Sequence, residues 1–224
     1  IDDLTTYADA AYAERYRKMV QSMRAAEAAL GVDGPSEVAA TLTETVARTA
    51  YRLMAIKDEY EVARLFTDGA FAKAVEDAFE GTTAIEFHMA PPLFARTDPR
   101  TGHPMKRRFG PWMMGALKLL ARAKRIRGTL LDPFRFNRER TMEKALIERF
   151  EAVVAQLAKG LSTGNLATAH QTVEAFDSIR GYGHVKLANH GRAIALIDER
   201  LANWRDTGKV VQISGTSTDR KAVG

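Results

Sequence analysis

Apolar side chains recur at three- and four-residue steps through most of the chain, a spacing that places them on one face of an α-helix. This pattern predicts helices over residues 4–30, 35–66, 70–79, 112–127, 138–159, 165–176 and 185–204. Turn-forming residues separate several of these segments, as at Gly34-Pro35, Asp68-Gly69 and Asp132-Pro133. The sequence therefore predicts a mainly α fold.

One segment near the middle departs from the helical pattern. Residues 82–89 alternate in character and are rich in β-forming side chains, so they predict a strand. Residues 106–109 are expected to return as its partner after a loop at 95–105. We expect a helical domain over 1–206 with a small inserted β-hairpin at about 82–110. A mobile polar tail is expected over 207–224, with a short strand at 210–213.

Composition limits the chemistry available to the chain. Of its 224 residues, 46% are hydrophobic and 27% charged, which is ordinary for a globular protein. It has no cysteine, which excludes disulfides, a thiolate nucleophile and cysteine-bound iron–sulfur clusters within these residues. No apolar stretch is long enough to span a membrane. We expect a cytoplasmic protein with no membrane partner.

Positive charge is concentrated in one segment. Residues 96–127 hold ten Lys and Arg and one acid, a net charge of +9, whereas the rest of the chain carries 23 bases and 27 acids. We expect Trp112, Leu117 and Leu120 in the core, with the bases on the opposite side. These bases form either an ordinary solvated face or a docking surface for an anionic partner. The docking candidates are Lys106, Arg107, Arg108, Arg122, Lys124, Arg125 and Arg127.

No complete catalytic or metal-binding constellation follows from the sequence. The histidines form no His-x-x-x-His pair, and no Gly-x-Ser-x-Gly elbow is present. The acids at 58, 59 and 61 are expected on an ordinary surface face, where Lys57 and Glu61 form an i,i+4 pair. We predict neither a catalytic residue nor a metal ligand.

A glycine-bearing turn precedes the last predicted helix. Its amides and bases are candidates for binding an anion or a neighbouring domain. The alternative is a tight turn between helices that needs glycine for its backbone alone. The residues are Arg180, Gly181, Tyr182, Gly183, His184 and Lys186.

Five segments, taken in order, resemble the carboxy-terminal domain of the single-chain indolepyruvate ferredoxin oxidoreductases. They are Tyr7–Tyr16, Leu53–Leu65, Phe87–Leu93, Phe109–Met113 and Ile179–Lys186. The resemblance implies an accessory domain of a large 2-oxoacid oxidoreductase. That enzyme uses thiamine diphosphate, magnesium, 4Fe-4S clusters and coenzyme A, all bound in other domains, and passes electrons to ferredoxin. It also implies other domains or subunits as partners, and we expect a homo-oligomer.

A different class of function stays open beside this one. A free-standing helical module that binds nucleic acid or protein would also explain a basic segment with nearby aromatic residues. No known nucleic-acid signature accompanies the bases, so we do not expect nucleic acid as the main partner. A small independent enzyme is the weakest alternative, because no catalytic constellation supports it.

Overall fold

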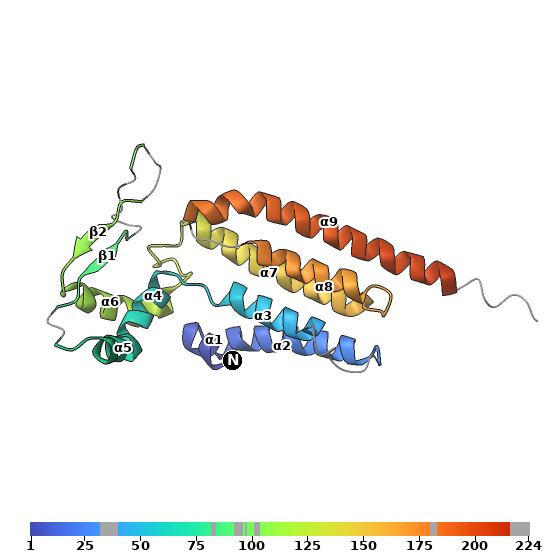
Figure 1. The fold of residues 1–224 in the computed structure, drawn as a ribbon, viewed down its shortest axis with the longest axis horizontal. Coiled ribbons are helices and arrows are strands. Elements are labelled where there is room, and N and C mark those ends of the chain that lie inside the picture. The colour runs from blue at the N-terminus through green and yellow to red at the C-terminus, as the bar shows by residue number, and fades with distance from the viewer. Residues whose placement is uncertain are drawn as a thin grey trace, which may run out of the picture. The chain divides into compact units, whose positions relative to one another are not determined.

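The computed structural model describes residues 1–31, 40–81, 84–91, 96, 98–100, 104–179 and 183–215, without the side chains of 138, 183–188 and 208–215. This part of the chain is mainly helical, with a two-stranded antiparallel hairpin near the middle, which confirms the predicted fold class (Figure 1). Its contacts fall into two compact units. Unit 1 comprises residues 1–55 and 142–224, and unit 2 comprises residues 56–141.

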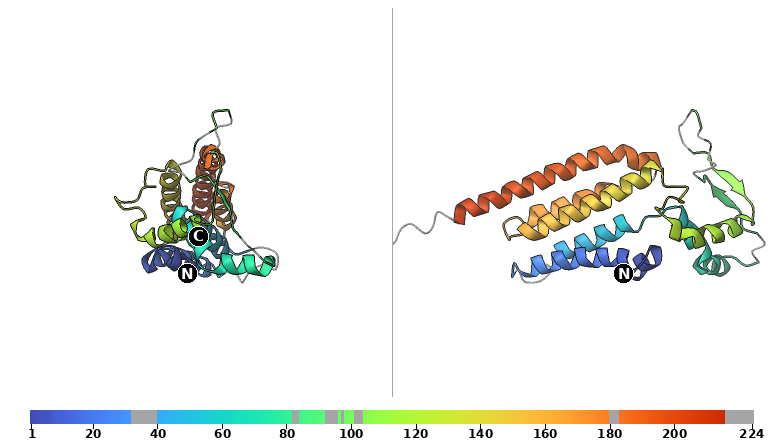
Figure 2. Two further views of the ribbon diagram at one scale, coloured as in Figure 1. Left: turned by 90° about the vertical axis from the view of Figure 1, so that its left-hand side faces the viewer. Right: turned by 180° about the vertical axis from the view of Figure 1, so that it is seen from behind.

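Unit 1 is built from helices that run alongside one another (Figures 1 and 2). They are α1 (Asp2–Tyr7), α2 (Ala10–Ala28), α3 (Leu42–Met54), α7 (Arg138–Gly160), α8 (Leu166–Ala175) with the short helix η2 (Phe176–Ser178), and α9 (Gly183–Gly215). The first residues of α7, 138–141, belong to unit 2. Helix α2 packs on α3, α3 on α8, and α8 on α9. Phe150 and Phe176 meet edge to face at the centre, with their ring centroids 4.8 Å apart. These buried side chains form the core that the helical spacing predicted.

Two long predicted helices are each divided in the structure. The predicted helix 4–30 breaks before Asp9, whose carboxylate accepts a hydrogen bond from the Tyr12 amide at 2.8 Å and caps α2. The predicted helix 35–66 breaks between α3 and α4 (Glu59–Thr67), and Asp58 caps α4. Helix α3 itself starts after Thr41, which forms a capping box with Glu44, and residues 35–39 of the predicted helix lie outside the described part. Capping side chains, which offer amides a partner outside the helix, thus set boundaries that periodicity alone missed.

The last helix is longer than predicted. Helix α9 continues through Gly215 and crosses residue 206, the expected boundary between domain and tail. The predicted strand at 210–213 is wrong, because these residues belong to α9. Helices α5 (Ala70–Ala78), α7 and α8 agree with their predicted ranges to within a residue or so.

Unit 2 joins α4 and α5 to a hairpin and a further helix. Strands β1 (Phe87–Met89) and β2 (Arg107–Phe109) pair antiparallel, with His88 opposite Arg108. Helix α6 (Met113–Arg122) follows, continued by the 3-10 helix η1 (Ala123–Ile126). The core of this unit consists of Ala63, Phe87, Met113 and Leu117. The hairpin was predicted, although β1 is shorter than the expected 82–89, of which residues 82 and 83 lie outside the described part.

None of the helices in the described ranges is both long and apolar enough to cross a membrane.

Candidate interaction surface

A buried carboxylate organises the loop that follows η1 in unit 2. Asp132 is 2% exposed. Its Oδ1 accepts hydrogen bonds from the Tyr60 hydroxyl and the Phe134 amide, each at 3.0 Å. Its Oδ2 accepts from the Gly128 amide and from Nη1 of Arg140, each at 2.7 Å. Four donors therefore satisfy this carboxylate, which pins residues 128–134 to α4 and to the start of α7.

The same ionic cluster extends to the start of α4. Nη2 of Arg140 lies 2.7 Å from Glu59 and 3.3 Å from Asp58. Asp58 has a second basic partner, because Nε of Arg127 lies 2.7 Å from its carboxylate. Asp58, expected on an open surface face, is buried, and Glu61 pairs with Arg64 rather than with Lys57. The surface interpretation of these acids is therefore wrong for Asp58.

The pKa values of this cluster follow its contacts. Burial alone would raise the pKa of Asp132. The amides of Gly128 and Phe134, the Tyr60 hydroxyl and the charge of Arg140 outweigh burial, so its pKa lies below the usual value. Burial and the hydrogen bond to Asp132 raise the pKa of Tyr60 above its ordinary range. At neutral pH the cluster therefore holds an ionised carboxylate and a protonated phenol.

The loop held in this way displays large apolar side chains to solvent. Leu130, Leu131 and Phe136 are 85%, 77% and 80% exposed. The guanidinium of Arg135 lies 4.4 Å from the centroid of the Phe136 ring, a cation–π contact. Exposing apolar groups to water is unfavourable, and the hydrogen bonds of Asp132 within the loop and its ion pair with Arg140 hold the loop in this conformation. We call residues 128–136 the docking loop.

A second exposed apolar surface lies on α6. Met113 and Leu117 are buried and Leu120 is partly buried, as expected. Trp112, predicted in the core, is 65% exposed, and Leu119 is 71% exposed. In a helix, positions 112 and 119 are nearly two turns apart and lie on the same side, opposite 113 and 117. The prediction for Trp112 was wrong because helical spacing gives each face its members but does not say which face is covered.

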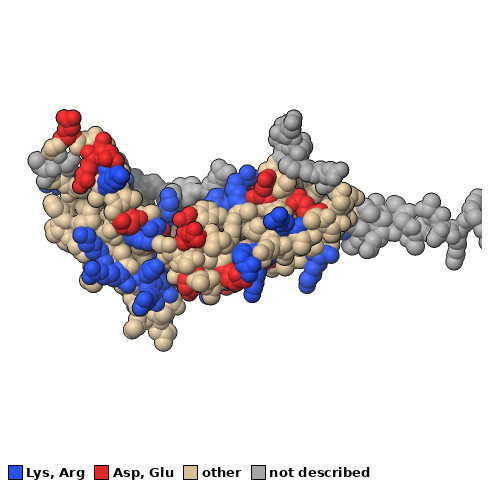
Figure 3. Space-filling view, turned by 90° about the horizontal axis from the view of Figure 1, so that it is seen from below, with Lys and Arg blue, Asp and Glu red and all other residues tan. Residues whose placement is uncertain are grey.

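The basic docking candidates differ in the exposure of their side chains and in their ion pairs. Lys106, Arg107, Arg122 and Arg125 are exposed. Arg108 is also exposed, and its guanidinium lies 3.6 Å from Glu86, whereas Lys124 is half-buried. Arg127 has only 17% of its side chain exposed and is bound to Asp58, so its role is internal. On the face shown in Figure 3, Lys and Arg side chains of unit 2 gather apart from a group of Asp and Glu side chains.

The other candidates are only partly placed. Arg180, Gly181 and Tyr182 lie outside the described residues, and Gly183 begins α9. The side chains of His184 and Lys186 are not described, so an anion site at this turn stays a prediction. Among the described side chains, no group of three or more His, Asp or Glu is arranged to hold a metal ion.

The sequence contains an indication of the exposed docking loop that the search for helical periodicity does not detect. Leu130 and Leu131 stand between Gly128 and Pro133, in a segment expected to turn. Adjacent large apolar residues in a short turn cannot both reach a core on one side, so at least one is expected in solvent.

Comparison with known proteins gives one match. The model of a family described as "Family of unknown function (DUF6537)" matches residues 1–199. The chain matches no curated protein and no solved structure.

Proposed function

The chain belongs to this family of unknown function, and we propose that it is an interaction domain that docks an acidic protein through unit 2. One observation carries the proposal. Residues 105–138 contain six of the ten exposed large apolar side chains of the described chain. The same residues contain ten Lys and Arg and a single acid, the buried Asp132. The six side chains are Met105, Trp112, Leu119, Leu130, Leu131 and Phe136.

A protein partner fits this surface better than a nucleic acid does. Trp, Phe, Met and Arg are enriched in protein interfaces, and Trp and Arg are among the residues that contribute most of the binding energy. Seven of the ten bases are Arg. Arg127 is bound to Asp58, but the planar fork of an exposed Arg can bind a partner's carboxylate through two hydrogen bonds. Phosphate binding would use the bases but gives no role to the exposed Leu130 and Leu131. Since Asp132 fixes their loop, little conformational entropy would be lost on docking.

The resemblance of five ordered segments supports a place for this domain in a larger enzyme. We propose a cytoplasmic 2-oxoacid oxidoreductase in which other domains bind thiamine diphosphate, magnesium, 4Fe-4S clusters and coenzyme A and perform the chemistry. In that setting the acidic partner would be ferredoxin, which accepts the electrons. The remaining surfaces would contact other domains, or other copies in a homo-oligomer.

The test uses charge reversal in the complete polypeptide that contains this chain. Arg107, Arg122 and Arg125 are replaced together by Glu, and association with an acidic ferredoxin is followed at low and high salt. We expect the association rate to fall about tenfold or more at low salt, and the difference to shrink at high salt, because steering by exposed charge is screened. Ferredoxin reduction should fall with it.

A matched control reverses three exposed bases of unit 1, Lys18, Arg24 and Arg48, and so changes the net charge by the same amount. Equal effects of the two triple variants would contradict a specific surface on unit 2. In a second variant, Leu119→Ser with Leu130→Ser should speed dissociation without changing the salt dependence. Binding to duplex DNA or to phosphatidylserine vesicles, with no binding to ferredoxin, would overturn the protein-docking proposal.

A further inference from the structure

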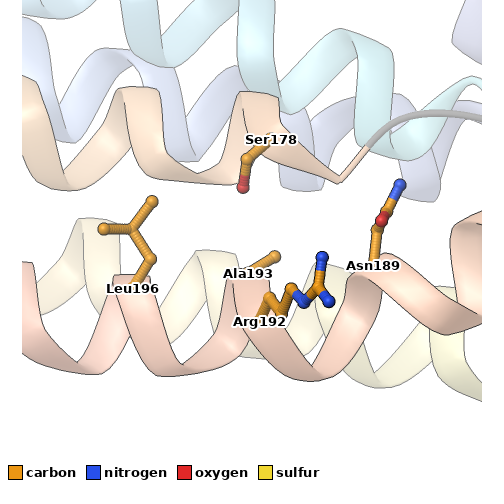
Figure 4. Close-up of a pocket in the computed structure, with 5 residues that line it drawn as sticks. All are labelled: Ser178, Asn189, Arg192, Ala193 and Leu196. Atoms are coloured by element: carbon orange, nitrogen blue, oxygen red, sulfur yellow. The ribbon is translucent and has the colours of Figure 1, made fainter.

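A small cavity of about 270 Å³ opens between the end of η2 and the first half of α9 in unit 1. Ser178 lines it from η2, and Asn189, Arg192, Ala193 and Leu196 line it from α9 (Figure 4). This volume lies below the range of typical drug-sized pockets, so it suits a ligand of only a few heavy atoms.

The α9 side of the cavity is divided into a polar half and an apolar half. Residues 189, 192, 193 and 196 follow one another at steps of three, one and three, which places them on a single face of the helix. The polar pair, Asn189 and Arg192, comes first along the helix. The apolar pair, Ala193 and Leu196, comes next. A ligand in this cavity would therefore meet hydrogen-bond donors at one end and hydrocarbon at the other.

Among the described residues, no acidic side chain lines the cavity. Within the described part of the chain, no hydrogen bond or ion pair joins the side chain of Arg192 or of Asn189 to another residue. The acid adjacent to Ser178, Asp177, is bound by Arg52 at 2.7 Å. On α9, Asp198 is bound by Arg149. Of the side chains that the structure describes, none occupies the guanidinium of Arg192, which can therefore bind an anion from solution.

We propose that this cavity binds a small carboxylate with a short aliphatic tail. The guanidinium of Arg192 would donate two parallel hydrogen bonds to the carboxylate, and the Asn189 amide would donate a third. The tail would lie over Ala193 and Leu196. A doubly charged phosphate suits the cavity less well, because half of the described α9 lining is apolar and the described lining contains a single cation. The proposal stands apart from docking on unit 2, since it uses only residues of unit 1.

Nuclear magnetic resonance titration of the whole chain with 3-methylbutyrate tests the proposal. We expect saturable shifts centred on the amides of Asn189 and Arg192, with a dissociation constant on the order of 1 mM for so small a ligand. Acetate, which lacks the tail, should bind about tenfold more weakly, because it buries less hydrocarbon. Arg192→Gln should weaken 3-methylbutyrate binding about tenfold or more.

Two further variants separate the site from general charge effects. Arg205→Gln removes an exposed arginine from the same helix and should leave binding unchanged. Leu196→Asn should abolish the preference for 3-methylbutyrate over acetate while acetate still binds. The proposal is overturned by an absence of saturable shifts up to about 50 mM. It is equally overturned by the same loss in Arg205→Gln and Arg192→Gln, or by tighter binding of inorganic phosphate than of 3-methylbutyrate.

Discussion

Asp132→Asn is the substitution that most directly tests how unit 2 holds its docking loop. Asparagine has the shape of aspartate, but one of its two ends is an NH₂ donor instead of an acceptor. Each carboxylate oxygen of Asp132 accepts from two donors. In either orientation of the Asn amide, its NH₂ group therefore faces two hydrogen-bond donors. The amide also lacks the negative charge that attracts Arg140.

The expected loss follows from these contacts. The least unfavourable orientation keeps the oxygen toward Gly128 and Arg140, where its two strongest contacts lie. The Tyr60 hydroxyl can then turn to accept from the new NH₂, but the buried Phe134 amide loses its acceptor. One unsatisfied amide and one weakened charge-assisted bond together cost about 2–4 kcal/mol of stability in unit 2.

Hydrogen exchange reports on this loop directly. The Gly128 amide is protected by its bond to Asp132, and a loss of 2–4 kcal/mol lowers its protection by about 30- to 1,000-fold. The effect also has a pH signature. Because the folded pKa of Asp132 is lowered, its stabilisation is present above the unfolded value, about 3.9, and is lost as pH falls through the folded value. The difference between wild type and Asp132→Asn should therefore shrink below about pH 4.

The control is Glu86→Gln, which neutralises a carboxylate of the same unit that is 48% exposed and lies 3.6 Å from Arg108. It should change stability by less than about 0.5 kcal/mol. If Asp132→Asn left Gly128 as well protected as Glu86→Gln does, the loop would not depend on the buried carboxylate, and its description as a pinned docking loop would fail.

Two stability predictions concern unit 1. Thr41→Ala should cost about 0.5–2 kcal/mol in chemical denaturation, because it removes the side chain that caps α3, whereas Thr5→Ala, at an exposed hydroxyl on α1, should cost less. Gly160→Ala should destabilise by about 1–3 kcal/mol, because the added Cβ would lie 2.9 Å from the ring of Trp204, which is buried and cannot swing aside. Gly191→Ala, with open space around its Cβ, should instead be neutral or stabilising, and equal losses at both glycines would refute the steric explanation.

Only part of the candidate surface could be predicted from the sequence. The cluster of bases is visible in the order of residues alone, and so is the hairpin that carries Lys106 and Arg107. That Arg127 serves an internal ion pair was not visible, because its partner Asp58 is 69 residues away and both look like surface residues in isolation. The exposure of Trp112 was likewise decided by which side of α6 packs on α4.

What the sequence by itself determined is the local structure. The periodicity of apolar residues predicted α5, α7 and α8, and the alternation before Pro91 predicted a hairpin, because these patterns reflect geometry within a few residues. The tertiary structure decided which faces are covered and which charges meet. Asp58, Asp132 and Arg140 form one buried cluster only after α4, the docking loop and α7 have come together. Burial is a property of packing between distant segments, and so is the choice of which apolar residues stay in water.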